Sequence, residues 1–367
     1  MPYYSAQSLI LPTTTVRRER SLPANAISNG AAREGAGVAA DDVVLRGLLP
    51  SDFIVLDALK PLGLRKAEDI TEEMIQATPG ATLLEGDPVI IRGKGRRARV
   101  LKAPATSVFV RMEGGDVVLQ SNPEQVEVKA MYPGRITSVR GGGTSVLIET
   151  SGALIQGAWG NGKSAYSQLR LEPREGGIES LLGDTLVAEY RNAAVVMTRP
   201  ILSETVFTVA AQHSLNALIA PSMHSNMREL ALSQPYPVLL MEGFGELEMS
   251  EIVYNLLRDN EGRPATINAV EPARWSPDRP ELLITLGTTV AAPVPVMDQP
   301  MTEGAFVRIA RAPLRGRSGR VKRIVETPRL VENGLRFPGA EIELLNGQTV
   351  FVPLANLEML GRPVERS

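Results

Sequence analysis

Residues 217–241 read ALIAPSMHSNMRELALSQPYPVLLM, and the fold class that we predict from the sequence rests on them. Three apolar residues, Leu218–Ala220, form a short buried strand that Pro221 ends. Apolar residues then recur at helical spacing over Ser225–Ser233, and a second apolar run covers Pro237–Met241. Strands that are apolar on both faces and alternate with helices of about ten residues are typical of a parallel sheet covered by helices.

The same alternation continues on both sides of this stretch. A strand and a helix precede it, and a helix and two strands follow it: Ala194–Thr198, Ser203–Asn216, Met249–Arg258, Ala265–Val270 and Leu282–Leu286. With right-handed crossovers, these strands would build a small Rossmann-like parallel sheet over residues 181–290. No G-x-G-x-x-G follows the first strand, so the sequence predicts no dinucleotide cofactor.

Polar residues follow the apolar strands of this α/β segment. They are Thr198, Ser222, His224 and Glu242. Ligands of open α/β sheets bind at the carboxyl ends of the strands, so these side chains would converge in a ligand loop near Glu242. There His224 and Glu242 would act as base and orienter, or the group would hold a small polar ligand. The alternative is that all four are helix caps and turn residues.

The residues before this segment are rich in short strands. Residues 81–175 contain alternating apolar runs, roughly every 8–10 residues, separated by Gly-rich turns, which predicts a small barrel or sandwich. Within residues 1–80, the phrase G-x-x-V-x-x-x-D-x-V is carried by Gly35, Val38, Asp42 and Val44. This phrase resembles part of the barrel-sandwich (lipoyl/biotinyl-like) domains. No Lys stands at the tip of a Met-Lys hairpin, so no attached lipoate or biotin is implied.

The C-terminal residues 301–362 carry the most specific pattern in the chain. Residues 303–325 read EGAFVRIARAPLRGRSGRVKRIV, and Asn346–Gly347 separates two later alternating runs, a strong hairpin signal. The residues that match a family pattern are Gly304, Val307, Ile309, Pro313, Gly316, Gly319, Val321 and Ile324. In this order they resemble the KOW motif of the small SH3-like barrels in ribosomal proteins and transcription-elongation factors. The resemblance implies such a barrel, with a nucleic acid or a nucleoprotein complex as its partner.

Two basic clusters are the candidate contact residues for that partner. One lies in the KOW-like segment, where no acidic residue stands between 304 and 325, and the other lies in a hairpin near residue 97. Together they comprise Arg308, Arg311, Arg315, Arg317, Arg320, Lys322, Arg323, Arg96, Arg97 and Arg99. Such cations bind phosphates without reading the base sequence. Two alternatives stay open: a docking surface for an acidic protein and an ordinary solvated basic face.

The composition narrows the chemistry that the chain can perform. Its 367 residues include no Cys and two His, His213 and His224, which excludes disulfides, thiolate nucleophiles and Cys- or His-rich metal centres. The formal net charge of −2 leaves nucleic-acid binding to a local patch. Residues 157–164 match G-x-x-x-x-G-K-S, yet too few residues follow before Pro173 for the helix of a phosphate loop, so a Gly-rich turn is favoured over nucleotide binding.

From these observations we expect a multidomain α/β plus all-β protein. Its parts would be 1–80, partly barrel-sandwich-like; 81–175, a small barrel or sandwich; 181–290, the Rossmann-like domain; and 301–362, the KOW/SH3-like barrel. We expect a non-catalytic binding or scaffold protein without cofactor or metal, whose KOW-like barrel contacts a nucleic acid, a nucleoprotein complex or a protein partner. The alternatives are a structural self-assembling subunit, hence a homo-oligomer, and an enzyme or ligand-binding protein that uses the loop near Glu242.

The chain also predicts where the protein resides. Residues 1–11 lack the basic start and sustained apolar run of a signal peptide, and no apolar run reaches the length of a membrane helix. We therefore expect a cytoplasmic protein without membrane insertion.

Overall fold

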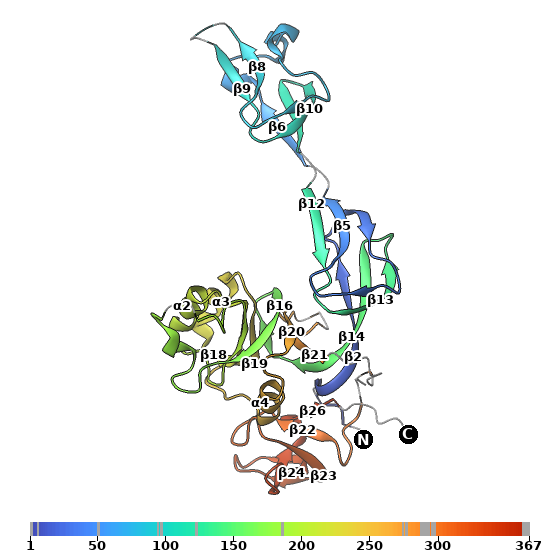
Figure 1. The fold of residues 1–367 in the computed structure, drawn as a ribbon, viewed down its shortest axis with the longest axis vertical. Coiled ribbons are helices and arrows are strands. Elements are labelled where there is room, and N and C mark those ends of the chain that lie inside the picture. The colour runs from blue at the N-terminus through green and yellow to red at the C-terminus, as the bar shows by residue number, and fades with distance from the viewer. Residues whose placement is uncertain are drawn as a thin grey trace.

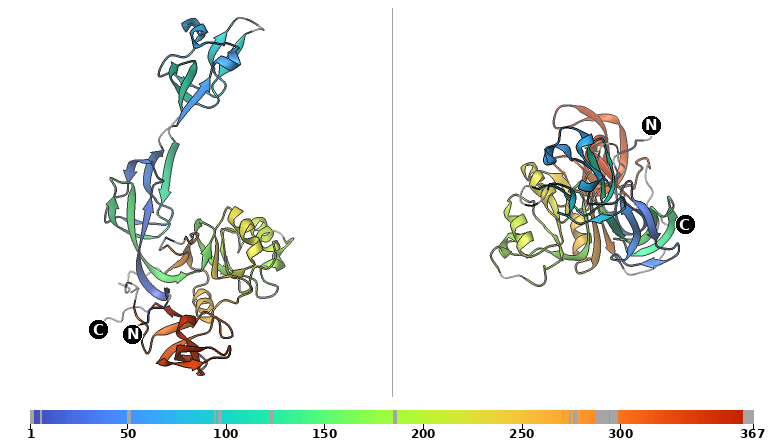
Figure 2. Two further views of the ribbon diagram at one scale, coloured as in Figure 1. Left: turned by 180° about the vertical axis from the view of Figure 1, so that it is seen from behind. Right: turned by 90° about the horizontal axis from the view of Figure 1, so that it is seen from above.

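The protein is elongated, and its parts follow one another along its length (Figure 1). The computed structural model describes residues 3–361 except 6, 50–51, 94, 96–97, 122–123, 185–186, 274, 276–277, 287–293 and 295–298. A tip module (residues 52–121) occupies one end, a stalk of long strands follows, and a base with the C-terminal module (residues 301–361) occupies the other end. The view from behind shows the same succession (Figure 2). The described residues form a mostly β structure with several sheets.

The tip module is built from short strands punctuated by turns. Its four-stranded sheet has the order β6-β11-β10-β7, and β8 pairs with β9. The elements are β6 (Phe53–Asp57), α1 (Leu59–Leu62), η1 (Ala67–Asp69), η2 (Glu72–Met74), β7 (Thr82–Leu83), β8 (Pro88–Arg92), β9 (Arg99–Lys102), β10 (Ser107–Glu113) and β11 (Asp116–Ser121). Its own core includes Leu62, Ile90, Phe109 and Leu119. Asp52 and Ser121 are joined by hydrogen bonds, so the tip begins and ends at one place.

The stalk pairs strands from before the tip with strands from after it. Its strands are β2 (Ile10–Ser21), β3 (Ile27–Ala31), β4 (Gly37–Val38), β5 (Val43–Leu49), β12 (Glu124–Lys129), β13 (Gly134–Arg140) and β14 (Ser145–Gln156). β12, β5 and β3 form one sheet, and β2 runs antiparallel to β14. A core that includes Val44, Leu45, Ile136 and Ile148 lies between these sheets. Because β2 and β14 are each 12 residues long, they extend from the stalk into the base.

The base is formed around one large mixed sheet. The strands are β15 (Trp159–Gly160), β16 (Lys163–Leu171), β17 (Ala194–Val196), β18 (Ala217–Met223), β19 (Val238–Phe244), β20 (Pro264–Ala269) and β21 (Glu281–Thr285). Joined to the stalk strands, they make an 11-stranded sheet of order β15-β19-β18-β17-β16-β20-β21-β14-β13-β4, with β2 beside β14. The helices are η4 (Ile178–Leu181), α2 (Thr205–Gln212), η5 (Ser225–Met227), α3 (Arg228–Ser233) and α4 (Glu251–Arg258).

The predicted fold class, with a Rossmann-like parallel domain over residues 181–290, is wrong. β16 to β19 do run parallel to one another, but β20 runs antiparallel to β16, and β21 runs antiparallel both to β20 and to β14 of the stalk. The α-helices of this part are short, with six to eight residues each. A strand buried on both faces is apolar whichever way its neighbours run, so the apolar runs indicated strands but not their direction.

Both faces of the base sheet are covered. On one face α2 and α3 pack against the sheet through residues that include Phe207 and Ala231. On the other face α4 packs with Val253 and Leu257, together with Ile10 of β2. This double covering explains why β18 is buried along its whole length.

A partly buried ion pair joins the stalk strand β2 to the base strand β21. The guanidinium of Arg18 contacts both carboxylate oxygens of Glu281, at 2.5 and 2.6 Å, and the Tyr132 hydroxyl donates to the same carboxylate at 3.0 Å. Burial and the neighbouring carboxylate raise the pKa of Tyr132 well above its ordinary value, so the phenol stays a donor.

The C-terminal module is a six-stranded sheet of order β1-β26-β22-β23-β24-β25. Its elements are β1 (Gln7–Ser8), β22 (Phe306–Ile309), β23 (Ser318–Leu330), β24 (Arg336–Leu344), β25 (Thr349–Pro353), η6 (Leu354–Asn356) and β26 (Leu357–Leu360). The predicted hairpin at Asn346–Gly347 is present, since β24 and β25 are antiparallel and Gly347 has a φ of 82°. β25 ends the sheet and, among the described strands, pairs with β24 alone.

No described helix is both long enough and apolar enough to span a membrane.

Candidate functional site

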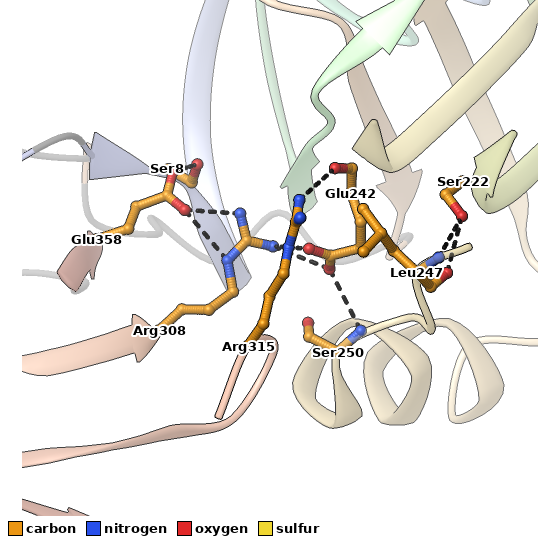
Figure 3. Close-up of polar contacts among 8 residues, drawn as sticks. All are labelled: Ser8, Ser222, Glu242, Leu247, Ser250, Arg308, Arg315 and Glu358. Atoms are coloured by element: carbon orange, nitrogen blue, oxygen red, sulfur yellow. Dashed lines mark hydrogen bonds and ion pairs between the residues drawn. The ribbon is translucent and has the colours of Figure 1, made fainter. Parts of the chain in front are cut away.

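A cluster of ion-paired side chains lies where the C-terminal module meets the base (Figure 3). Arg308 of β22 extends between Glu242, near the end of β19, and Glu358 of β26. Its Nη1 lies 2.9 Å from Glu242 Oε1, and its Nη2 lies 2.7 Å from Glu358 Oε2. The side chains of Arg308, Glu242 and Glu358 are 12%, 6% and 14% exposed. One cation therefore sits between two carboxylates, nearly out of solvent.

The electrostatics favour the charged forms of Arg308 and Glu358. Burial lowers the pKa of Arg308, but the charges of Glu242 and Glu358 outweigh burial and hold that pKa above its ordinary value. Burial raises the pKa of Glu358, but the charge of Arg308 and hydrogen bonds from Ser8 and Arg308 bring it below its ordinary value. Arg315 adds a long hydrogen bond, 3.4 Å, to the backbone oxygen of Glu242. Glu242 is thus an anchor for the C-terminal module.

Ser222, another residue of the predicted ligand loop, braces the backbone beside Glu242 (Figure 3). Its buried Oγ accepts a hydrogen bond from the Leu247 amide at 2.8 Å and lies 2.8 Å from the Gly245 oxygen, to which it donates. The Ser250 amide donates to Glu242 Oε1 at 3.3 Å. The local chain reversal after β19 is therefore held by these two side chains.

Thr198 and His224 have other partners. The amide and hydroxyl of Thr198 both donate to Glu172 Oε1. His224 Nε2 lies 3.0 Å from Glu246 Oε1, with both side chains well exposed. The predicted pairing of His224 with Glu242 is absent from the described contacts. Ser222 and Glu242 lie in β18 and β19, whereas Thr198 and His224 lie outside the described strands and helices. A ligand loop built from these four residues stays a prediction.

A charged cleft of about 750 Å³ opens beside the ends of β16 and β17. Its lining includes Glu172, Tyr190, Arg199 and Tyr254. Glu172 is 6% exposed, and its second oxygen accepts from the Ile178 amide at 3.1 Å. Sequence reasoning missed Glu172, although it directly follows β16. Its position directly after a strand could have indicated a site residue. The predicted domain boundary near residue 175 instead assigned Glu172 to the preceding β-rich region, so it was not considered.

His213 is buried and paired. Its Nδ1 accepts from the Val187 amide at 3.2 Å, and its Nε2 lies 3.0 Å from the Leu181 oxygen. Both ring nitrogens are therefore used, with the proton on Nε2.

The KOW-like cluster divides into buried and exposed cations. Arg308 is the buried anchor, and Arg323 pairs with Glu341 of β24 at 3.0 Å. Arg320 stands opposite Glu343 in register, and its guanidinium lies over the Phe306 ring at 5.7 Å. The remaining members, all exposed, are Arg311, Arg315, Arg317 and Lys322. Strand pairing thus brings acidic residues next to a segment that has none of its own.

The second basic cluster is only partly described. Arg96 and Arg97 lie outside the described residues. The guanidinium of Arg99 lies over Gly63, which ends α1, and Arg92 donates to the backbone oxygens of Leu62 and Gly63. These two cations therefore meet the carboxyl end of a short helix.

The G-x-x-x-x-G-K-S match leads into a strand. Its last residues, Lys163 and Ser164, begin β16, so no helix follows the glycines. Asn161 is buried, where its amide group donates to two backbone oxygens and its carbonyl accepts from Val238 at 3.0 Å. Gly160 is needed because a Cβ there would lie 2.3 Å from the backbone oxygen of Ala269. These contacts are those of a packed turn.

A second large groove, of about 670 Å³, lies on the C-terminal module. Three segments line it: residues 309–314 without Ala310, residues 330–333 with Phe337, and residues 350–356 without Leu354. Most of these residues are apolar, and the sequence analysis did not single out the later two segments.

Neither a candidate metal site nor a comparison with known proteins identifies a function. Within the described ranges, no group of three or more His, Cys, Asp or Glu is placed to hold a metal ion. No protein-family model matches the chain, and no curated protein matches it. The resemblances to KOW and barrel-sandwich domains stay predictions.

Proposed function

We propose that the chain is a non-catalytic binding or scaffold protein whose C-terminal module contacts a negatively charged partner. The observation that carries this proposal is that one cation of the module is buried in ion pairs while others are exposed. Arg308 anchors the module to the base through Glu242 and Glu358, which holds the exposed Arg311, Arg317 and Lys322 in a fixed place. No described carboxylate forms an ion pair with these three exposed cations.

The enzyme alternative depends on Glu242, which is paired with Arg308. Catalysis in the ligand loop would require Glu242 to be free to exchange a proton or hold a ligand. Glu242 is 6% exposed and held by Arg308 through two contacts, at 2.9 and 3.1 Å. A carboxylate in that state is a structural partner, which favours binding over catalysis.

Exposed cations on one module suit a partner that carries many negative charges. Contacts between such cations and nucleic-acid phosphates release counterions, so binding would weaken steeply with salt. Glu341 and Glu343 reduce the positive charge on β23, which keeps an acidic protein surface as the second outcome of the test.

The proposal is tested by charge reversal on the whole protein. The variant combines Arg317→Glu, Arg320→Glu and Lys322→Glu. Its matched control reverses three exposed cations elsewhere, Arg140, Lys163 and Arg191. Fluorescence anisotropy follows labelled duplex DNA, single-stranded RNA and poly-glutamate, each at about 50 and about 200 mM salt.

We expect one class of probe to bind, with affinity falling at the higher salt. The module variant should weaken binding at least about tenfold and lower the salt slope by about 2–3, while the control variant binds as the unaltered protein does. Binding to nucleic acid supports the first reading, and binding to poly-glutamate alone supports an acidic protein. Binding that ignores the module variant, or no binding to any probe, overturns the proposal.

One observation favours a second candidate, a self-assembling subunit. β6 is the end strand of the tip sheet, and its Phe53 and Val55 are 62% and 60% exposed. An unprotected apolar edge strand is a template for pairing with another chain. Light scattering of the protein and of the Phe53→Ser, Val55→Thr variant would show it: a larger assembly that the variant reduces to monomers supports self-association, whereas a monomer in both rejects it.

A further inference from the structure

The groove on the C-terminal module has an apolar floor that the described part of the chain leaves open. Its walls include Pro313 and Leu314 from the β22–β23 loop, Leu330 from β23, and Phe351 and Pro353 from β25. Leu330 is 64% exposed although it lines a concave surface. Apolar side chains that line an open groove are characteristic of surfaces that a ligand covers.

The groove also follows the open end of a sheet. Residues 350–353 of β25 line it, and β25 pairs with β24 alone among the described strands. A strand with one unpaired side offers backbone donors and acceptors to an extended segment. The shape and the strand edge together favour an elongated occupant over a compact one.

The charges around the groove favour an acidic occupant. Arg311 is exposed within the lining, and no described carboxylate forms an ion pair with it. Arg336 stands directly opposite Leu330 in the β23–β24 pairing and is exposed as well. Glu332 is the acidic member of the lining. Two exposed cations beside an apolar floor complement a segment that alternates apolar and acidic side chains.

The geometry points to a peptide-docking groove: we propose that it binds an extended segment of a partner protein in which aliphatic or proline side chains are flanked by acidic residues. The inference rests on the proposed function and specifies the chemistry of the partner. Phe351 is already covered by the Arg329 guanidinium, 5.2 Å from its ring centre, and packs against Gly339. A stacked nucleobase would therefore have to displace Arg329, so a peptide suits the groove better than single-stranded RNA.

The test uses the full-length protein and a fluorescein-labelled peptide of four Glu-Leu-Pro repeats. The comparison peptide carries Lys in place of Glu. Leu330→Ser removes an exposed groove residue, and its matched control is Leu345→Ser, a leucine 54% exposed in the same module outside the groove. Arg311→Glu reverses the charge within the lining, and its control, Arg140→Glu, reverses an exposed cation of the stalk that does not line the groove.

We expect the acidic peptide to bind at least about tenfold more tightly than the basic one. Leu330→Ser should weaken binding about tenfold because it removes apolar contact area, and Arg311→Glu should weaken it severalfold. Both controls should change binding less than about twofold.

Three results would overturn the inference. They are equal binding of the two peptides, equal effects of Leu330→Ser and Leu345→Ser, and displacement of the peptide by single-stranded RNA whose own binding Leu330→Ser weakens. If the peptides fail while reversal at Arg317, Arg320 and Lys322 still abolishes binding of the charged probes, the groove inference fails and the proposed function stands.

Discussion

Replacing Arg308 by Met should detach or weaken the junction between the C-terminal module and the base. The substitution leaves Glu242 and Glu358 buried with no cation between them. Removing one partner of a buried ion pair costs about 3–5 kcal/mol, since the remaining charge stays desolvated. We expect the lower part of this range, because Glu358 keeps the Ser8 hydroxyl and Glu242 keeps the Ser250 amide.

Urea unfolding followed by tryptophan fluorescence provides the assay. Trp159 is 7% exposed, and its ring lies 5.3 Å from that of Phe244, two residues beyond Glu242. Trp275 is 86% exposed, so its emission should change little on unfolding. The unfolding transition near the junction is therefore reported mainly by Trp159.

Two further variants make the result decisive. Arg17→Met breaks an exposed pair with Glu149, whose side chains are 63% and 37% exposed, and should cost about 0–1 kcal/mol. Adding Glu242→Gln and Glu358→Gln to Arg308→Met removes the uncompensated charges and should restore much of the lost stability. The reasoning is refuted if Arg308→Met costs no more than Arg17→Met, or if the triple variant is less stable than the single one.

Three other outcomes follow from described contacts. Because the folded pKa of Glu358 lies below its ordinary value of 4.5, the stability that its ionised form contributes is fully present above about pH 4.5 and is lost as the pH falls through the folded pKa. The Glu358→Gln variant should lack this acid-dependent loss of stability, and equal acid unfolding profiles of the two proteins would contradict it. Gly160→Ala should cost at least about 1–3 kcal/mol in thermal unfolding, because its Cβ meets the Ala269 backbone, whereas Gly37→Ala, with open space around it, should change stability little. His213→Ala should lower the free energy of unfolding by about 1–3 kcal/mol, because the Val187 amide and the Leu181 oxygen lose their hydrogen-bond partner. A cost no larger than that of the exposed His224→Ala would argue against a structural role for His213.

Local patterns in the sequence predicted short elements well. The alternating apolar runs noted within residues 81–175 include the strands β8 and β10, and the turn at Asn346–Gly347 joins β24 to β25. Each of these depends on alternation and turn chemistry within a few residues. Pairing direction depends on residues that are distant in the sequence. We expected β20 and β21 to join a parallel sheet, but β20 is antiparallel to both of its neighbours, β16 and β21.

The candidate site shows the same limit. Glu242 was predicted as part of a ligand loop and Arg308 as part of a basic contact surface, and the structure makes them partners. They lie 66 positions apart in the chain, and neither local charge nor periodicity indicates such a pairing. The groove was missed for a similar reason, since Pro313, Leu330 and Phe351 come together only through the folding of three segments.

The place where the tip module joins the stalk has a consequence for how this protein can change over evolutionary time. The chain leaves the stalk after β5 and returns in β12, and these two strands pair with each other from Leu49 and Glu124 onward. Asp52 and Ser121 are hydrogen-bonded to each other at that point, so the tip module connects β5 to β12 in the way that a turn connects the two strands of a hairpin. A domain attached in this way can be exchanged, enlarged or lost while the register of the strands beneath it is kept.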